Sequence, residues 1–159
     1  MKADEINLEA IDSLIEKSVR TATPAVADSV AYPERQMTAQ ELQEFWRNVS
    51  LVAMATVGTN GQPHIAPVHA RLKGASLRVF VYENAVRRSD LHTNPRVAFT
   101  TWDNRGAVVI IYGRAAEVPG SRRPARPGRS GKERYVVEFE VKLTRIYAMR
   151  PPAKRLETT

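Results

Sequence analysis

The sequence has no cysteine and only three histidines among its 159 residues. The lack of cysteine excludes disulfides, thiolate nucleophiles and cysteine-ligated metal sites. No apolar run approaches the ~18 residues that a membrane-spanning helix needs. Residues 1–5 are acidic and lack the apolar core of a secretory signal peptide. We therefore expect a cytoplasmic protein that makes no contact with a membrane.

The length fits one domain, because a chain of this size buries roughly two-thirds of the surface that it exposes when unfolded. The net charge of +7 is unevenly distributed. Residues 1–46 hold 4 basic and 9 acidic side chains, whereas residues 119–159 hold 11 basic and 4 acidic ones. The basic excess favours anionic ligands in general. The acidic N-terminal arm is expected to lie on the basic body or on a partner copy.

Two helices are expected before the first strand. Leu8, Ile11, Ile15 and Val19 recur at helical spacing and predict a helix over 7–20. Residues 21–36 read as an irregular linker, and Thr38 with a glutamate three residues later predicts a capping box that begins a second helix. We therefore divide the chain into an N-terminal helical arm and linker (1–37), a barrel domain (38–150) and a C-terminal tail (151–159).

The rest of the chain predicts short strands separated by turn signals. Strands are expected over 51–57, 63–73, 77–82, 96–102, 107–118 and 136–150, and one short helix over 85–93 with Asn84 as its N-cap. Asn60-Gly61 predicts a type I′ hairpin turn. Gly113 suggests a close backbone approach, and a bulge is expected near Thr144. The fold class is mainly β: a six-stranded antiparallel split β-barrel with short helices.

Residues 119–132 interleave four arginines with proline and glycine and are expected to form a mobile loop. The segment lacks aromatic residues for stacking on bases, so nucleic acid is not an expected partner. An oligonucleotide-binding barrel is accordingly the last alternative that we consider.

Arg87 and Arg88 fall in the first turn of the short helix, where free backbone N–H groups already attract anions. Two guanidinium groups would add charge-assisted hydrogen bonds to a phosphate. A solvated basic helix face is the competing interpretation, and spacing alone does not decide between them.

No residue pattern indicates catalysis by the chain's own side chains. His64 and His69 are an odd number of residues apart on one expected strand, so they face opposite sides and form no metal site. No serine lies in a nucleophile elbow and no carboxylate pair stands out. We therefore expect no catalytic residue, and any reactive atoms would belong to a cofactor.

Several motifs in order resemble the FMN-binding split-barrel family, the superfamily of pyridoxamine 5′-phosphate oxidase. The opening hairpin matches at 51–58 (LVAMATVG) and 60–68 (NGQPHIAPV). The helix-to-strand signature matches at 87–98 (RRSDLHTNPRVA), followed by 113–115 (GRA) and the final strand. The resemblance covers about residues 38–150.

The resemblance implies a set of cofactor-binding residues. Arg87 stands where the family places its phosphate-binding residue, with Arg88 beside it and Arg71 assisting. The strand that lines the flavin ring carries Val68, His69, Ala70 and Arg71, and Val81 and Tyr82 end the strand before the helix. The family is dimeric with two flavins at the interface, so Thr101 and Trp102 are expected to reach the partner's cofactor.

The sequence also departs from the family's oxidase. Val86 stands where the oxidase has arginine, and Val108 where it offers a polar contact to the flavin ring. The C-terminal substrate motif is absent, so oxidation of vitamin B6 is not expected.

The resemblance therefore implies a homodimeric, FMN-dependent oxidoreductase that acts on a small molecule and takes electrons from a reduced nicotinamide. One alternative is a reductase on the same fold that uses a deazaflavin coenzyme. Another is a non-catalytic flavin- or haem-binding protein, for which His69 is the residue to examine. The sequence identifies neither the substrate nor the electron donor.

Overall fold

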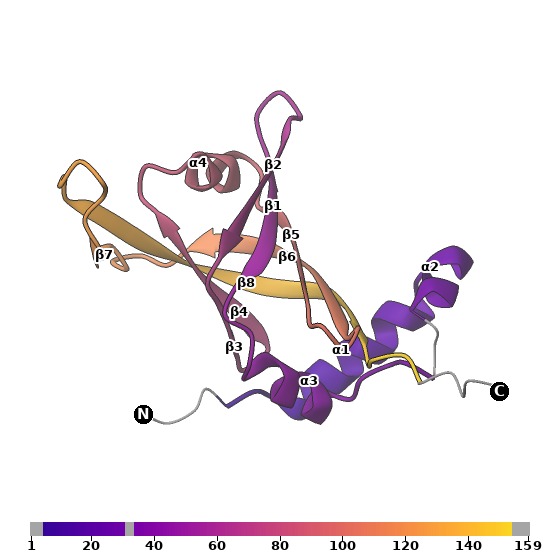
Figure 1. Cartoon of the computed structure of the whole chain (residues 1–159). Helices are drawn as coiled ribbons and strands as arrows, with labels where there is room; N and C mark the ends of the chain where they lie inside the picture. The colour runs from indigo at the N-terminus through magenta and orange to yellow at the C-terminus, as the bar shows by residue number, and fades with distance from the viewer. Residues whose placement is uncertain (1–4, 31–33, 154–159) are drawn as a thin grey trace.

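The computed structural model describes residues 5–30 and 34–153, which form a curled antiparallel sheet with helices at its ends (Figure 1). The strands are β1 (Val52–Val57), β2 (Pro63–Val68), β3 (Ala70–Lys73), β4 (Ser76–Tyr82), β5 (Arg96–Trp102), β6 (Val108–Glu117), β7 (Arg123–Ala125) and β8 (Arg134–Met149). The helices are α1 (Leu8–Arg20), α2 (Pro24–Ser29), α3 (Ala39–Trp46) and α4 (Val86–Thr93).

The sheet closes on itself without a complete ring of hydrogen bonds. Its strand order is β2-β1-β5-β6-β8-β4-β3, with β7 added along β8. The two outer strands, β2 and β3, are consecutive in the chain and separated only by His69. One residue therefore joins the two edges, and the split-barrel prediction is confirmed.

Helices cover the two ends of the barrel. α4 packs against β1, β4 and β6, and α1 packs against β8 and α3. In Figure 1, α4 lies at the end opposite α1 and α3. The helices α1 and α3 and the sheet supply the main core, whose largest fully buried side chains include Ile11, Ile15, Leu42, Met54, Leu77, Ile111, Phe139 and Ile146.

Several local expectations are confirmed. The helix expected over 7–20 is α1, which begins after Asn7 as its N-cap, and Thr38 and Glu41 form both bonds of the predicted capping box. Between β6 and β8 the register shifts at Tyr112/Gly113, so Thr144 is the unpaired residue of a bulge. A Cβ on Gly113 would lie 2.5 Å from Val141 Cγ1, which explains the glycine by the close approach of β8.

Other local expectations are wrong. Asn84 is not the N-cap of α4. It lies in a turn in which Ala85 N–H donates to Tyr82 O, and Ala85 is the N-cap. The hairpin turn is not the two-residue type I′ form. Gly61 N–H donates to Gly58 O, so the turn spans 58–61, and only the φ of +80° at Gly61 requires glycine.

The strand count is eight rather than six. The expected strand 63–73 breaks at His69, and the segment 119–132 contains β7. That strand pairs with β8, and Arg123 stacks on Phe80 while the preceding Arg122 stacks on Tyr135, contacts that the composition of the segment did not indicate. The linker 21–36 contains α2, capped by Thr23, while residues 31–33 lie outside the described residues.

No helix in the described ranges is both long and apolar enough to cross a membrane. The cytoplasmic location and the division into arm, barrel and tail stay predictions, and residues 1–4 and 154–159 of the arm and tail lie outside the described ranges.

Candidate functional site

The start of α4 has no side-chain cap, which leaves its first turn open to an anionic ligand. Ala85 is the N-cap, and although its backbone oxygen accepts a hydrogen bond from Arg88 N–H, its methyl side chain can accept none from the backbone N–H groups that follow it. The first N–H groups of a helix have no partner within the helix. A phosphate placed at this end would satisfy such donors.

Arg87 lies in this open first turn and is half-buried. Its Nε is buried and has no hydrogen-bond partner within the described part of the chain. A buried, charged donor without a partner costs free energy, and an anion beside it would remove that cost. This orphaned atom fits the phosphate site predicted from the sequence.

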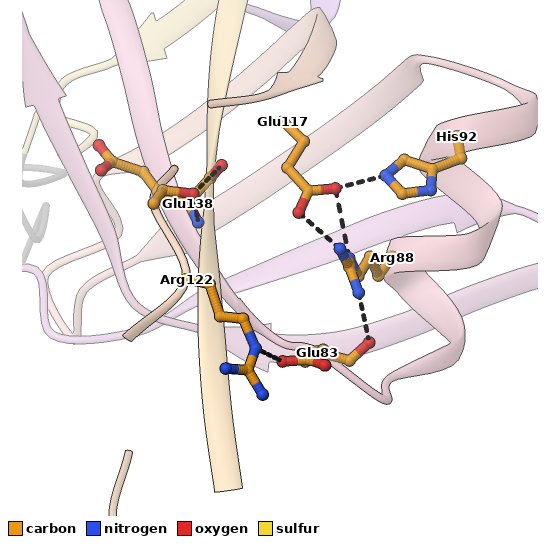
Figure 2. Close-up of polar contacts among 7 residues, drawn as sticks. Glu83, Arg88, His92, Glu117, Arg122 and Glu138 are labelled. Atoms are coloured by element: carbon orange, nitrogen blue, oxygen red, sulfur yellow. Dashed lines mark hydrogen bonds and ion pairs between the residues drawn. The ribbon is translucent and has the colours of Figure 1, made fainter. Parts of the chain in front are cut away.

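Arg88 is next in the sequence but is already paired (Figure 2). Its guanidinium donates two hydrogen bonds to Glu117, at 2.8 and 3.2 Å, and a third to the backbone oxygen of Glu83. His92 reaches the same carboxylate, with 2.5 Å between Nε2 and Oε2. These contacts make Arg88 a link between α4 and β6, and its role as a second phosphate ligand stays a prediction.

The ion pairs around Arg88 shift the titration of their members. Hydrogen bonds from Arg88, and then from His92, hold the pKa of Glu117 below its ordinary value. The Glu117 carboxylate in turn raises the pKa of Arg88. A separate pair joins Arg122 to Glu83, as Figure 2 shows, and ties the start of β7 to the turn before α4.

Val81 and Tyr82 end β4 directly before this turn. Val81 is buried in the core, and its place beside a cofactor stays a prediction. The Tyr82 ring is half-buried and is covered by Arg134, whose guanidinium carbon lies 3.6 Å from the ring centroid. The sequence reasoning did not include Arg134, because no spacing relates the start of β8 to the end of β4.

The junction of β2 and β3 is spanned by Val68, His69, Ala70 and Arg71. Val68 and Ala70 point into the barrel, and the Ala70 oxygen accepts a hydrogen bond from Trp46 in α3. His69 and Arg71 are exposed, and His69 Nδ1 lies 2.8 Å from the backbone oxygen of Ser50. That bond places the proton of a neutral imidazole on Nδ1 and leaves Nε2 as an acceptor.

Thr101 and Trp102 lie at the opposite end of the barrel from α4. Thr101 is buried and donates to Leu51 O, whereas Trp102 is 65% exposed. Together they line a cavity of about 430 Å³ on the outer face of β1, β2 and β5, whose wall also includes Ile65. Arg87 is not among its lining residues. Within one chain, Trp102 and residues of the first hairpin therefore line one cavity, and Arg87 does not contribute to its wall.

The sequence reasoning missed one buried polar group on α4. Asp90 is 4% exposed and accepts hydrogen bonds from Thr56, at 2.8 Å, and from His64 Nδ1, at 2.6 Å. These bonds fix α4 to β1 and β2, and so they position Arg87. Asp90 follows Arg87 by three residues, one helical turn, but nothing in the spacing relates it to Thr56 or His64. Among the described residues, no three or more histidine, aspartate or glutamate side chains are grouped so that they could hold a metal ion.

Comparison with known proteins gives a family and a set of similar folds. The family model described as pyridoxamine 5′-phosphate oxidase matches residues 38–158. No curated protein matches the chain.

Three solved structures illustrate the range of proteins whose fold is similar to that of this chain. A conserved hypothetical protein from Mycobacterium tuberculosis has a TM-score of 0.60 and 16% identity, covering 74% of this chain and 88% of its own. An FAD-binding protein from Mesorhizobium loti has a TM-score of 0.55 and 17% identity, covering 72% and 94%. The heme storage protein of Vibrio cholerae has a TM-score of 0.54 and 14% identity, covering 69% and 93%. At these identities the likeness concerns the fold alone.

Proposed function

The chain belongs to the pyridoxamine 5′-phosphate oxidase-like split-barrel family, and on that premise we propose that it is a homodimeric, FMN-dependent oxidoreductase. The observation that carries the proposal is the buried, unpartnered Nε of Arg87 in the uncapped first turn of α4. A phosphomonoester is the group that this combination of a guanidinium and free N–H groups would hold.

In this proposal the chain binds and orients the cofactor. Arg87 holds the phosphate, and the backbone of Val68, His69 and Ala70 lies along the flavin ring. The flavin supplies the redox chemistry when bound, accepting and donating electrons at its ring. The substrate is a small molecule, and a reduced nicotinamide is the proposed electron donor. Because Val108 and the chain's C-terminus differ from the family's oxidase, vitamin B6 is not the proposed substrate.

An exposed apolar face supports the dimer. Around the cavity described above, Leu51 directly before β1 is 48% exposed, Ile65 on β2 is 73% exposed and Trp102 on β5 is 65% exposed. Contiguous apolar surface of this kind marks interaction sites in monomeric folds. A second copy bound to this face would place its own Thr101 and Trp102 beside the cofactor that Arg87 of the first copy holds.

The proposal is tested by identifying the small molecule that leaves the purified protein on denaturation. Mass spectrometry should find FMN, and the native protein should oxidise a reduced nicotinamide when an electron acceptor is added. Titration of cofactor-free protein with FMN and with a deazaflavin coenzyme separates the two redox cofactors. A colourless protein that binds neither would contradict the proposal.

One observation favours a second candidate, a non-catalytic haem-binding protein. The Nδ1 of His69 is held by a backbone carbonyl, which is the usual second contact of a metal-ligating histidine. Its exposed ring could then bind iron through Nε2. A haem titration of wild type and His69→Ala separates the candidates, because a histidine-ligated haem would lose its spectrum in the variant while FMN binding would remain.

A further inference from the structure

A cavity of about 630 Å³ lies between α2 and the strands β5, β6 and β8, away from the start of α4. Its walls are mainly apolar, from Val26, Val30, Val97, Ile110, Tyr147 and Met149. Tyr112 and Tyr147 meet edge to face within it, with 6.5 Å between ring centroids. The volume lies within the range of ordinary small-molecule sites, roughly 300–1,000 Å³.

The charges around this cavity are all of one sign. Arg96, Arg114 and Arg145 line it, and none of its described lining residues is an aspartate or a glutamate. Arg96 and Arg114 are direct cross-strand partners on β5 and β6. Like charges placed opposite each other destabilise a sheet. An anion bound between the two guanidinium groups would be attracted to both of them and would offset their mutual repulsion.

Arg145 is positioned by neutral groups alone. Its Nη1 donates to the backbone oxygen of Ser18, to Thr21 Oγ1 and to the Tyr147 hydroxyl, at 3.1 to 3.3 Å. These acceptors fix the guanidinium without neutralising it. The half-buried cation therefore lacks a counter-ion among the contacts that hold it in place.

We propose that this cavity binds an amphipathic carboxylate, an organic acid whose apolar body lies against the walls and whose carboxylate meets Arg96 and Arg114. Apolar walls select the body through burial of its surface. The guanidinium pair selects the head, because planar guanidinium and carboxylate groups form paired, charge-assisted hydrogen bonds. The proposal does not depend on flavin binding, since none of the cavity residues belongs to the proposed cofactor site.

Isothermal titration of the full chain with decanoate, and with decanol as its neutral match, tests this site. Decanoate should bind once per chain, and decanol should bind at least about tenfold more weakly, because it cannot form the charge-assisted bonds. Arg114→Gln should weaken decanoate about tenfold and leave decanol unchanged. Arg129→Gln removes the same charge from an exposed position outside the cavity and should change neither affinity.

A substitution that fills the cavity tests separately whether the apolar body of the ligand binds there. Val26→Trp, on the exposed α2 side of the cavity, should abolish binding of both ligands while thermal unfolding shows that the protein remains folded. No decanoate binding to wild type, or equal binding to Arg114→Gln, would overturn the proposal. Binding that occurs only when the protein is made monomeric would also overturn it, because a second copy would then be the occupant. Flavin absorbance in the same samples reports the cofactor site independently.

Discussion

At the scale of single residues, two adjacent arginines have opposite environments. The sequence predicts a phosphate-binding role for Arg87 and Arg88 alike, because both fall in the first turn of one helix. Successive helical side chains point about 100° apart, from 3.6 residues per turn. Arg88 therefore meets Glu117 on β6, while the Nε of Arg87 is buried and finds no hydrogen-bond partner among residues 5–30 and 34–153. The partner of Arg88 comes from a strand 29 residues later, which local spacing cannot predict.

The pairing of Glu117 predicts a dependence of stability on pH. Its folded-state pKa lies below the ordinary value of 4.5, chiefly because Arg88 donates hydrogen bonds to it. The pairs therefore stabilise the fold above that value, and this stabilisation is lost as pH falls through the folded-state pKa. We expect no more than about 1 kcal/mol, because solvent screens the partly exposed pair.

Urea unfolding of wild type and Glu117→Gln at several pH values measures this effect. Wild type should be more stable than the variant near neutral pH, and the difference should shrink as the pH falls below the ordinary carboxyl value of 4.5. A difference that stays constant down to pH ~2 would show that Glu117 does not act through its charge.

At the scale of elements, α4 is held in place by a buried carboxylate. Asp90→Ala would leave the Thr56 hydroxyl buried without its acceptor and would free His64. We expect a loss of about 1–3 kcal/mol in the free energy of unfolding. FMN affinity should fall as well, because the helix that carries Arg87 loses its anchor. Asp28→Ala, on a helix with no buried residues, is a control that should alter neither quantity.

The paired strands β6 and β8 give a second prediction. A Cβ on Gly113 would lie 2.6 Å from the backbone oxygen of Lys142, in addition to its clash with Val141. Gly113→Ala should therefore destabilise the barrel by roughly 1–3 kcal/mol. Ala116→Val, at an exposed position on the same strand, should stay within about 0.5 kcal/mol of wild type. Thermal unfolding of both variants measures this difference. A Gly113→Ala variant as stable as wild type would contradict the close approach of β8 to Gly113.

An element could be predicted from the sequence where residues close together in the chain determine it. The capping box at Thr38, the glycine at 113 and the bulge near Thr144 follow from short patterns, and the structure confirms them. β7 depends on contacts between segments far apart in sequence, such as Arg123 stacked on Phe80. The Asp90 site likewise joins α4 to two strands, so periodicity could indicate the helix but not its anchor.

At the scale of the whole molecule, closure of the sheet leaves one apolar face open. Strands β2, β1 and β5 lie side by side, and Ile65 stands 73% exposed on this face. If a second copy covers it, Ile65→Glu should convert the dimer to a monomer with little change in the fold, because a charge at the centre of an interface loses its hydration. Leu8→Glu, an exposed apolar residue on α1, is the matched control.

Sedimentation velocity measures the outcome. Wild type and Leu8→Glu should sediment as dimers and Ile65→Glu as a monomer. A wild type that is monomeric at all concentrations would remove the proposed contribution of Thr101 and Trp102 to a shared site.

The central claim is that Arg87 holds the phosphate of a flavin. FMN and riboflavin differ only in that phosphate, so the ratio of their dissociation constants isolates its contribution. Wild type and Arg129→Ala should bind FMN at least about tenfold more tightly than riboflavin, and Arg87→Ala should lose this preference. An FMN preference that survives in Arg87→Ala would contradict the account.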